Sequence, residues 1–390
     1  MTARIGRSGS AELFRGLLAG PSGFTRPVLV KRLRSEVVRD PRQVERLRTE
    51  ALLTARVPHP NVLSVIDTVL IDGELVVAHE DAKITDLLRL LEICATQRRR
   101  LPPRVVLGIG WQIADALAVA HHRADAALGL AGIAHGDLSP SNVLIESSGR
   151  ILLVDFGIGL HAQPSGPPLN KLGRLHGKPG YMSPELVVRG VIGPRSDFFA
   201  LGTLLWEMLT LRRLFSGKDA PETLRNVALA QIDERFARHP EVPPFVQDVL
   251  RKALRRQPDE RYADAREFQE ALIQCHPQGF FGIEVELARL VEEIAPIPPD
   301  APIELDVAGI SRPRAKSRVA SRMILPTTPG SVLAEPLSED PGEQWSEAEA
   351  PEIVDVLDGL NALPPLQLDA LPPPLPPEPP PLGPPPLPKP

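Results

Sequence analysis

Short apolar runs with strand character dominate the first eighty residues, and apolar positions at helical spacing dominate most of the following two hundred. β-Branched and apolar runs separated by turn residues predict strands. Apolar residues that recur every three or four positions predict helices with one buried face. The predicted strands lie within 5–14, 27–33, 61–80, 143–147 and 150–156, and the predicted helices within 40–57, 84–97, 104–123, 196–210, 264–275 and 282–294.

Three of the helical patterns have a well-defined apolar face. The face of the helix over 40–57 consists of Val44, Leu47, Ala51 and Leu52. The face of the helix over 104–123 consists of Val106, Ile109, Ile113, Leu117 and Ala120. The last helix, 282–294, is amphipathic and is predicted to pack back on the preceding domain through Ile283, Leu287, Leu290 and Ile294.

The composition changes after residue 295, where the chain becomes Pro-rich, acidic in places and poor in aromatic residues. More than half of the 45 prolines lie beyond this point. Such a segment cannot offset the entropy lost on ordering, so residues 296–390 are predicted to be disordered. The final tract, 372–390, favours polyproline II, which suits either a stiff spacer or a ligand for a proline-motif-binding partner.

Charge, cysteine content and hydropathy exclude several classes of protein. The net charge of −5 argues against a basic nucleic-acid binder. The two cysteines, Cys94 and Cys275, fall in apolar helical patterns and are predicted to be buried free thiols in a reducing compartment. No uninterrupted apolar run reaches the length that spans a bilayer, and no signal-peptide h-region is visible. A soluble, cytoplasmic protein is expected.

The stretch 133–157 carries the candidate chemistry. Asp137 precedes Asn142 by five residues, and Asp155 follows thirteen residues later in the sequence Asp-Phe-Gly. One carboxylate can accept the proton of an attacking hydroxyl, while the amide and the second carboxylate can hold Mg²⁺ against the phosphates of ATP. The apolar runs between them read as a hairpin around Ser-Ser-Gly, which would bring both metal ligands to one edge.

This ordered set resembles the eukaryotic-type (Hanks-type) serine/threonine protein kinases of bacteria. The resemblance extends from about residue 3 to residue 276 and includes an APE-like motif at 181–185 after a polar segment that matches an activation loop. It implies an α+β, bilobal fold with a small β-rich lobe (about 1–80) and a larger, mainly helical lobe (about 83–278), followed by the helix at 279–295. It also implies ATP and Mg²⁺ as cofactors and Ser/Thr hydroxyls of proteins as substrates.

The resemblance assigns roles to individual residues. Asp137 matches the catalytic Asp, Asn142 and Asp155 match the Mg²⁺ ligands, and Lys31 matches the phosphate-binding Lys that Glu50 positions. Further residues expected around the nucleotide are Gly6, Gly9, Leu13 and Val77, the last as gatekeeper before a hinge at 78–82. By the same resemblance, Asp197 braces the catalytic loop and Arg261 pairs with Glu185.

Several positions depart from the family's pattern. Ser8 and Ala11 stand where the second and third glycines of the glycine-rich loop usually lie. Leu29 replaces a small residue beneath adenine, where its bulk would crowd the base. Gly136 replaces the Arg that usually meets a phosphorylated activation loop, and between Gly157 and Tyr181 the only Ser or Thr is Ser165.

A further pair of departures suggests an exchange of functional groups. Ser139 stands where the family has a Lys two residues after the catalytic Asp, and Lys178 stands where it has a Thr. We hypothesise that Lys178 supplies the positive charge near Asp137 and that Ser139 supplies the hydroxyl. The combination of DxSPxN with GKxxYMSPE resembles kinases of myxobacteria-like bacteria.

Three functions fit these patterns. An active serine/threonine kinase is favoured because all five polar residues of the catalytic set are present. A pseudokinase that recruits partners through its proline-rich tail is the alternative suggested by Ser8, Ala11 and Leu29. Small-molecule phosphotransferases also carry His-Gly-Asp with a following Asn, but they generally lack the motif at 181–185, the 196–210 helix and the closing Arg.

Overall fold

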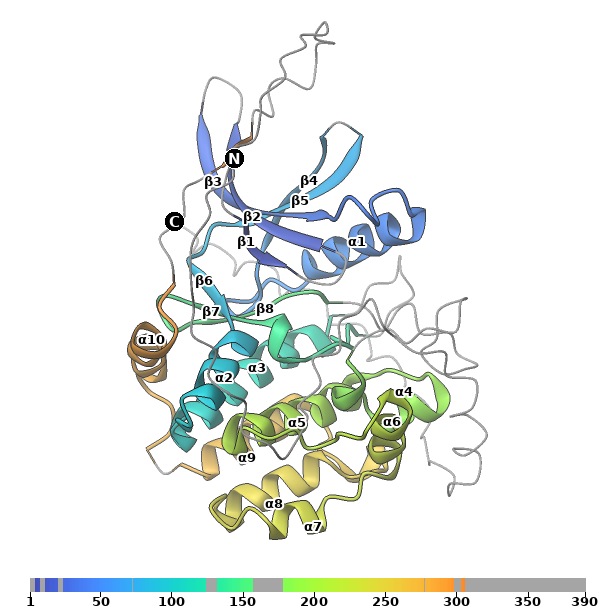
Figure 1. The fold of residues 1–390 in the computed structure, drawn as a ribbon, viewed down its shortest axis with the longest axis vertical. Coiled ribbons are helices and arrows are strands. Elements are labelled where there is room, and N and C mark those ends of the chain that lie inside the picture. Colours follow the sequence, from blue (N-terminus) through green and yellow to red (C-terminus); the bar gives the residue numbers. More distant parts are fainter. Residues whose placement is uncertain are drawn as a thin grey trace, which may run out of the picture.

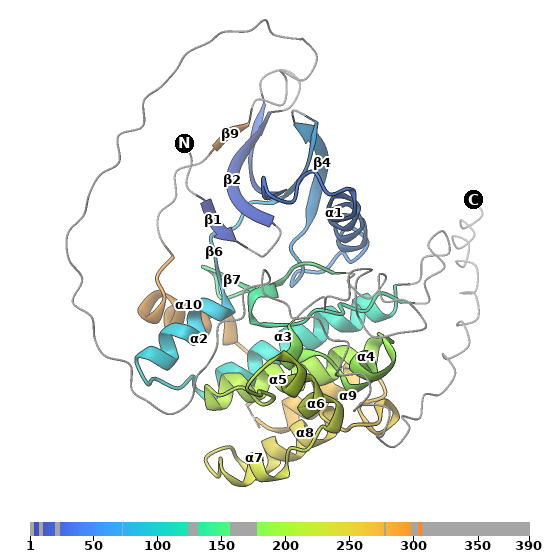
Figure 2. The same cartoon turned by 45° about the vertical axis from the view of Figure 1, so that its right-hand side comes forward.

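A computed structural model of the chain describes residues 4–7, 11–19, 24–71, 73–123, 132–156, 178–276, 278–297 and 303–305. These residues form a small amino-terminal lobe around one sheet and a larger, mainly helical carboxy-terminal lobe (Figure 1, Figure 2). The predicted α+β, bilobal architecture is confirmed. The predicted activation loop and most of the proline-rich tail lie outside the described residues.

The amino-terminal lobe is an antiparallel sheet with the strand order β1-β2-β3-β5-β4 and one covering helix. Its elements are β1 (Arg4–Arg7), β2 (Ala11–Ala19), β3 (Thr25–Leu33), α1 (Pro41–Thr54), β4 (Val65–Ile71) and β5 (Glu74–Glu80). Helix α1 begins after Asp40, whose carboxylate accepts a hydrogen bond from the backbone N–H of Arg42, and it has Pro41 in its first turn.

The carboxy-terminal lobe combines a small three-stranded sheet with a bundle of helices. The strands are β6 (Ile84–Asp86), β7 (Val143–Glu146) and β8 (Ile151–Leu153). The helices are α2 (Leu87–Thr96), α3 (Pro103–His121), α4 (Pro184–Arg189), α5 (Pro194–Thr210), α6 (Ala220–Leu229), α7 (Asp233–Ala237), α8 (Pro244–Ala253), α9 (Ala265–Gln274) and α10 (Ile283–Ile294). Short 3-10 helices occur at Pro140–Asn142, Pro179–Tyr181 and Pro258–Glu260.

Helices α3 and α5 form the centre of the larger lobe. The predicted apolar face of α3 is confirmed, since Val106, Ile109, Ile113, Leu117 and Ala120 are all fully buried. Within the described part of the chain, α3 is the one helix long and apolar enough to cross a membrane, but 72% of its most apolar stretch is buried inside the lobe. Cys94 and Cys275 are both buried and free, as predicted.

Two local predictions were wrong in detail. The helix predicted over 84–97 begins only at Leu87, because Ile84–Asp86 pair with β7 and the Asp86 carboxylate caps α2 by accepting the N–H of Arg89 at 2.7 Å. In α1, Leu52 was assigned to the apolar face but is 42% exposed, whereas Leu53 is buried. Leu53 is buried instead, because it packs with Val57 and Val62 in the main core.

Helix α10 packs on the larger lobe, as predicted from its apolar face. Ile283, Leu287, Leu290 and Ile294 are buried, and α10 lies against α2 and α3. Arg99 makes a two-pronged ion pair with Glu293 (2.8 and 2.9 Å), and Arg104 pairs with Glu286. The close approach of α10 also depends on glycines, because a Cβ at Gly108 would overlap the Ile283 side chain.

One segment of the predicted disordered tail is ordered in this structure. Residues Ile303–Leu305 form β9, which pairs in parallel with β2 at Gly16–Leu18. Strand β1 pairs only with the first part of β2, up to Phe14, so the rest of that strand edge is free to accept another strand. This pairing was not predicted, because composition gives no information on a strand edge that β1 leaves uncovered.

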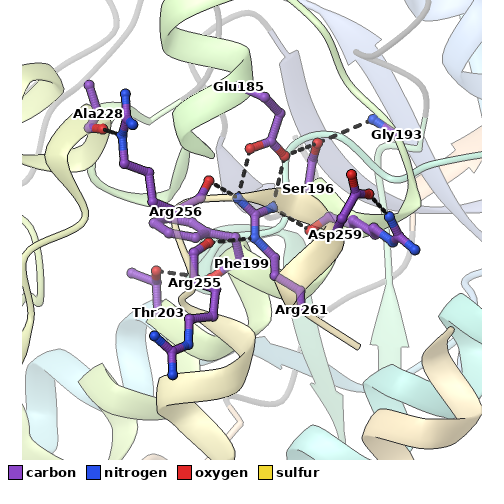
Figure 3. Close-up of polar contacts among 11 residues, drawn as sticks. Glu185, Gly193, Ser196, Phe199, Thr203, Ala228, Arg255, Arg256, Asp259 and Arg261 are labelled. Carbon is purple, nitrogen blue, oxygen red and sulfur yellow. Dashed lines mark hydrogen bonds and ion pairs between the residues drawn. The ribbon is translucent and has the colours of Figure 1, made fainter. Parts of the chain in front are cut away.

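A buried ion pair ties the segment after residue 180 to the base of the larger lobe. The Arg261 guanidinium donates to both carboxylate oxygens of Glu185 at 2.8 and 2.7 Å, and Ser196 donates to the same carboxylate (Figure 3). Arg261 also donates to three backbone carbonyls, those of Arg195, Arg255 and Arg256. The predicted pairing of Arg261 with Glu185 is confirmed, and its hydrogen bonds satisfy both charged groups away from water.

The packing of α10 predicts a difference between two turn glycines. Gly73 and Gly149 have nearly the same positive φ, 84° and 85°. No described atom lies within 4 Å of a Cβ built on Gly73, whereas one on Gly149 overlaps the backbone carbonyl oxygen of Glu284 in α10. Both alanine variants carry a backbone strain of roughly 1–2 kcal/mol. We expect Gly149→Ala to lose about 1–3 kcal/mol more than Gly73→Ala in urea unfolding. Equal losses would contradict the packing of α10 on this turn.

The Glu185–Arg261 pair predicts a pH-dependent stability. Burial opposes the ionisation of Glu185, but the charge and hydrogen bonds of Arg261 outweigh it and lower the carboxyl pKa below its ordinary value of 4.5. The ionised carboxylate therefore stabilises the fold above pH 4.5, and this contribution is lost as the pH falls from there through the lowered pKa.

Replacing Glu185 should remove this titration. We expect Glu185→Gln to be less stable than the wild type by roughly 3–5 kcal/mol at neutral pH, because Arg261 loses its buried counter-charge. The gap in unfolding free energy should narrow as urea melts are repeated at successively lower pH below 4.5. A gap that stays constant over this range would show that Glu185 is not the titrating group.

Candidate active site

Lys31 lies at the centre of the site, between the two lobes. Its Nζ is 3.1 Å from Glu50 Oε2 on α1 and 2.5 Å from Asp155 Oδ1 after β8. Burial disfavours the ammonium, but the two carboxylates outweigh burial and raise the pKa of Lys31 well above 10.5. Arg46, one helical turn before Glu50, donates to its other oxygen at 2.9 Å and fixes its orientation. The predicted Lys31–Glu50 pair is thus present, with Asp155 as a third member.

Asp155 reaches Lys31 from an uncommon backbone conformation. Its φ is +65°, in the left-handed region that non-glycine residues rarely adopt. Burial alone would raise the pKa of this carboxyl, but the neighbouring Lys31 charge and hydrogen bond lower it, so Asp155 is an anion. The next side chain, Phe156, is fully buried and packs on the His135 ring at 4.6 Å between centroids. The packing of Phe156 on His135 thus helps to fix the backbone at Asp155.

Asp197 holds the loop before Asp137 by accepting hydrogen bonds from its backbone. Its two carboxylate oxygens accept the N–H groups of His135 and Gly136, both at 2.8 Å, and His121 Nε2 lies 2.8 Å from the same carboxylate. Gly136 has φ +77°, a conformation that disfavours side chains and fits the absence of an Arg there. Asp197 thus braces the loop that presents Asp137, as predicted.

Asn142 connects Asp137 to the β7–β8 hairpin. Its Nδ2 donates to the backbone carbonyl of Asp137 at 2.8 Å and to the Asp137 carboxylate at 3.0 Å. The hairpin pairs Val143 with Leu153, and Val154 N–H donates to the carbonyl of Asn142 at 3.2 Å. The hairpin predicted between residues 143 and 156 therefore brings Asn142 beside the strand end that leads into Asp155.

The oxygens of Asn142 and Asp155 fit a magnesium ion. Mg²⁺ takes hard oxygen ligands and is usually held by one or two protein side chains together with substrate phosphates. Asp155 Oδ1 faces Lys31, and the carboxylate has a second oxygen to offer. Among the described residues no group of three or more His, Cys, Asp or Glu side chains gathers as a metal site. The donor set therefore suits a metal that arrives with a phosphate ligand.

Lys178 lies near Asp137 and donates a hydrogen bond to a serine of the same loop. Both residues line one small cavity, together with Met182, Leu186 and Ile192 among others. Lys178 Nζ donates to Ser141 Oγ at 2.6 Å. Ser139 is fully buried, and its Oγ lies 3.4 Å from Ser141 Oγ. The hydroxyl that Lys178 contacts therefore belongs to Ser141 in the 3-10 turn at 140–142, and the proposed role of Ser139 stays a prediction.

Apolar side chains fill the space beneath β3. Leu29 is fully buried in a cluster that joins both lobes and includes Leu63, Ala82, Leu144 and Leu152. Leu13, expected near the nucleotide, packs against the same cluster. The Leu29 side chain therefore packs in a cluster with residues of both lobes.

Arg15 closes the outer edge of this cluster. It lies opposite Leu29 on β2, and its guanidinium donates to the carbonyl of Ala82 at 3.0 Å and pairs with Asp81 at 3.2 Å. These contacts fasten β2 to the connection between the lobes. This role could not be predicted from the sequence, because an Arg on a strand is usually solvent-exposed.

The connection between the lobes begins later than predicted. Strand β5 continues to Glu80, so the connecting residues are 81–83 instead of 78–82. Val77 pairs with Lys31 and packs with Leu47 and Ala51 of α1, away from the cluster around Leu29. The side chain opposite Leu29 is His79. The strand register thus places Val77 beside Lys31 and His79 beside Leu29, and the gatekeeper role of Val77 stays a prediction.

His79 is a buried, neutral imidazole. Burial and the nearby Lys31 charge lower its pKa to about 4. Its Nδ1 has no hydrogen-bond partner among the described residues. Sequence reasoning did not single out this residue, although a histidine inside an apolar strand pattern was a visible signal.

The glycine-rich loop is described only in part. Gly6 lies in β1 and pairs with Leu13 after an irregularity in the ladder. Ala11 opens β2 and is buried. Gly9 and Ser8 lie outside the described residues, so their predicted roles around the nucleotide stay predictions.

Comparison with known proteins identifies the family. The protein kinase domain family matches residues 5–274 of the chain. "Tyrosine-protein kinase MasK" of Myxococcus xanthus is 30% identical over 273 residues, which cover 70% of this chain and 42% of that protein. "Probable serine/threonine-protein kinase SCO3848" of Streptomyces coelicolor is 33% identical (70% and 40%), and "Serine/threonine-protein kinase PrkC" of Bacillus subtilis is 30% identical (68% and 38%).

The chain thus spans about two fifths of the length of these curated relatives. The matched part holds both lobes and all the polar residues described above. Protein kinases as a family use ATP and Mg²⁺. Together, the matched residues and the geometry of Lys31, Glu50, Asp137, Asn142 and Asp155 lead to one conclusion: the chain belongs to the protein kinase family and groups with the eukaryotic-type kinases of bacteria.

Proposed function

We propose that the chain is a serine/threonine protein kinase that transfers the γ-phosphate of ATP to a protein hydroxyl. The observation that carries the proposal is the contact of Lys31 with both Glu50 and Asp155, which are the partners that an assembled kinase site needs. Asp137 lies beside this group, joined to Asn142. The set is therefore assembled without a conformational change in α1.

Each residue has a role that follows from its contacts. Asp137 orients the substrate hydroxyl and takes its proton, at the edge of a small cavity that Lys178 also lines. Lys31 binds the α- and β-phosphates, and Glu50 holds its ammonium in place. Asn142 and Asp155 hold Mg²⁺, which when bound neutralises charge on the phosphates. Lys178 adds a positive charge at the same cavity. Positioning and electrostatics supply most of the rate.

A serine/threonine specificity is favoured over tyrosine by Pro140, which follows the catalytic Asp as in the serine/threonine branch. The Streptomyces and Bacillus relatives bear serine/threonine kinase names, while the Myxococcus relative bears a tyrosine kinase name. The substrate is therefore proposed as a protein Ser or Thr, in bacterial signalling. The proline-rich tail is proposed as a recruitment arm for a proline-motif-binding partner.

The pseudokinase alternative is less well supported, because every polar residue of the catalytic set is present and in contact with its partner. Leu29 remains the feature that opposes nucleotide binding, since it fills the apolar space under β3. The Leu29→Ala variant described below tests whether this side chain obstructs the nucleotide base.

The first test is nucleotide binding by thermal shift on the full chain. Mg·ATP at about a hundred times its Kd should add roughly 2.7 kcal/mol to the folded state. We expect Lys31→Met and Asp155→Asn to lose this shift, because they remove the phosphate contact and a metal ligand. Lys218→Met, an exposed lysine far along the chain, is the matched control.

Transfer of labelled γ-phosphate to casein or a similar general substrate then tests turnover, and phosphoamino-acid analysis reads the acceptor. Labelled phosphoserine or phosphothreonine supports the proposal. Phosphotyrosine alone would contradict the acceptor specificity. Mg·ATP binding with no transfer to any protein would favour the pseudokinase alternative.

The apolar cluster generates a second prediction. Leu29→Ala should lower the Kd for Mg·ATP by about tenfold, because a base then enters without displacing a packed side chain. The same change should destabilise the free protein by about 2–5 kcal/mol. Val28→Ala is the matched control, because Val28 is equally buried but packs on the other face of the sheet with Val30 and Val76.

Calorimetry with Mg·ATP separates the two effects. The control should lose stability and keep its affinity for the nucleotide. If Leu29→Ala binds Mg·ATP no better than the wild type, the Leu29 side chain does not obstruct nucleotide binding.

A further inference from the structure

Ser141 joins Lys178 to the residues at the catalytic centre. It is the middle residue of the 3-10 turn Pro140–Asn142, four positions after Asp137. Its Oγ accepts a hydrogen bond from Lys178 Nζ at 2.6 Å and lies 3.2 Å from Asn142 Oδ1. Lys178 comes from a different part of the chain, just before the 3-10 helix at Pro179–Tyr181. A single hydroxyl thus links the segment before the APE-like motif to the loop of Asp137.

The direction of each hydrogen bond in this group follows from chemistry. An ammonium can only donate, so the Ser141 oxygen accepts from Lys178 and its own O–H is left to donate. The Asn142 amide is fixed because its Nδ2 donates to the carbonyl and the carboxylate of Asp137 at 2.8 and 3.0 Å. Its Oδ1 therefore points away from Asp137 and accepts from Ser141. The bonds form one directed chain, Lys178 to Ser141 to Asn142 to Asp137.

Ser139 does not take the same place. Its Oγ is 3.4 Å from Ser141 Oγ, and its side chain is fully buried. Because Ser141 has one hydrogen to donate and gives it to Asn142, the Ser139 hydroxyl is the donor in any bond between the two serines. The shorter contact and the fixed amide both favour Asn142 as the acceptor.

The hydrogen bond from Lys178 to Ser141 is also compatible with a charged ammonium. Ser141 is neutral, so its hydroxyl adds a hydrogen bond to the ammonium and contributes no opposite charge. Lys178 and Asp137 line the same small cavity, so the ammonium lies near the proposed catalytic carboxylate. A held cation at that place stabilises negative charge that develops during transfer.

We propose that Ser141 is a positioning residue that orients both the Lys178 ammonium and the Asn142 side-chain oxygen. This inference rests on the proposed kinase function, which it deepens. Its consequence is that loss of one uncharged hydroxyl affects both phosphoryl transfer and the metal-binding side chain.

The test compares Ser141→Ala with the wild type. Removing a hydrogen bond to a charged group should lower kcat about tenfold, with KM for ATP little changed. Ser141→Thr keeps the hydroxyl and should restore most of the activity. Ser148→Ala is the matched control, because Ser148 is an exposed serine of the β7–β8 turn. A double-mutant cycle with Lys178→Met should show that the two losses are not additive.

A readout independent of turnover uses Mn²⁺ as a spectroscopic probe. Titration of Mn²⁺ into the chain with saturating ATP, followed by electron paramagnetic resonance, gives the metal affinity. We expect Ser141→Ala to bind Mn²⁺ several-fold more weakly, since Asn142 Oδ1 loses one of its anchors. The control Ser148→Ala should match the wild type.

The outcomes separate the inference from the proposed function. An active wild type whose Ser141→Ala variant keeps full kcat, or loses activity additively with Lys178→Met, would overturn the inference and leave the kinase function intact. A chain that binds Mn²⁺ with ATP but transfers no phosphate would end the proposed function. The Mn²⁺ titration would then still decide on Ser141, with an unchanged affinity counting against it.

Discussion

The structure depends on one buried ammonium that faces two carboxylates. Lys31 belongs to the sheet, Glu50 to α1 and Asp155 to the start of the segment after β8, so their contacts fix three parts of the chain at once. An unpaired buried charge is costly, and Lys31 has both carboxylates as its counter-charges here. The left-handed backbone of Asp155 is the local cost, which the surrounding contacts offset. The polar site is therefore part of what holds the two lobes together.

In the larger lobe, too, buried carboxylates are stabilised by hydrogen-bond partners from other parts of the chain. Asp197, almost fully buried at the start of α5, accepts two backbone N–H groups of the loop before Asp137. Glu185 is enclosed by Arg261 and Ser196. Both carboxylates sit next to the fully buried apolar face of α5, so the helix core fixes their positions. Helix α5 thereby orients the loop that presents Asp137.

The structure around several residues that depart from the family pattern gives a physical reason for each departure. Leu29 fills an apolar space between lobes, and Arg15 fastens the outer edge of the same space. Gly136 occupies a backbone conformation that a side chain would strain. Lys178 meets a serine of the catalytic loop. Leu29, Gly136 and Lys178 thus each fit their local surroundings, which agrees with a site whose sequence and structure are consistent.

The sequence by itself determined the order of the elements, the apolar faces of α3 and α10, and the identity of Lys31, Glu50, Asp137, Asn142 and Asp155. These features are local in periodicity or fixed in spacing, so they can be read along one chain. It did not determine that Ser141 and not Ser139 meets Lys178, that His79 and not Val77 lies opposite Leu29, or that 303–305 pairs with β2. Only the tertiary structure decided these points. Strand register, turn geometry and free strand edges depend on contacts between residues far apart in sequence, and a shift of one or two residues changes which side chain faces the site.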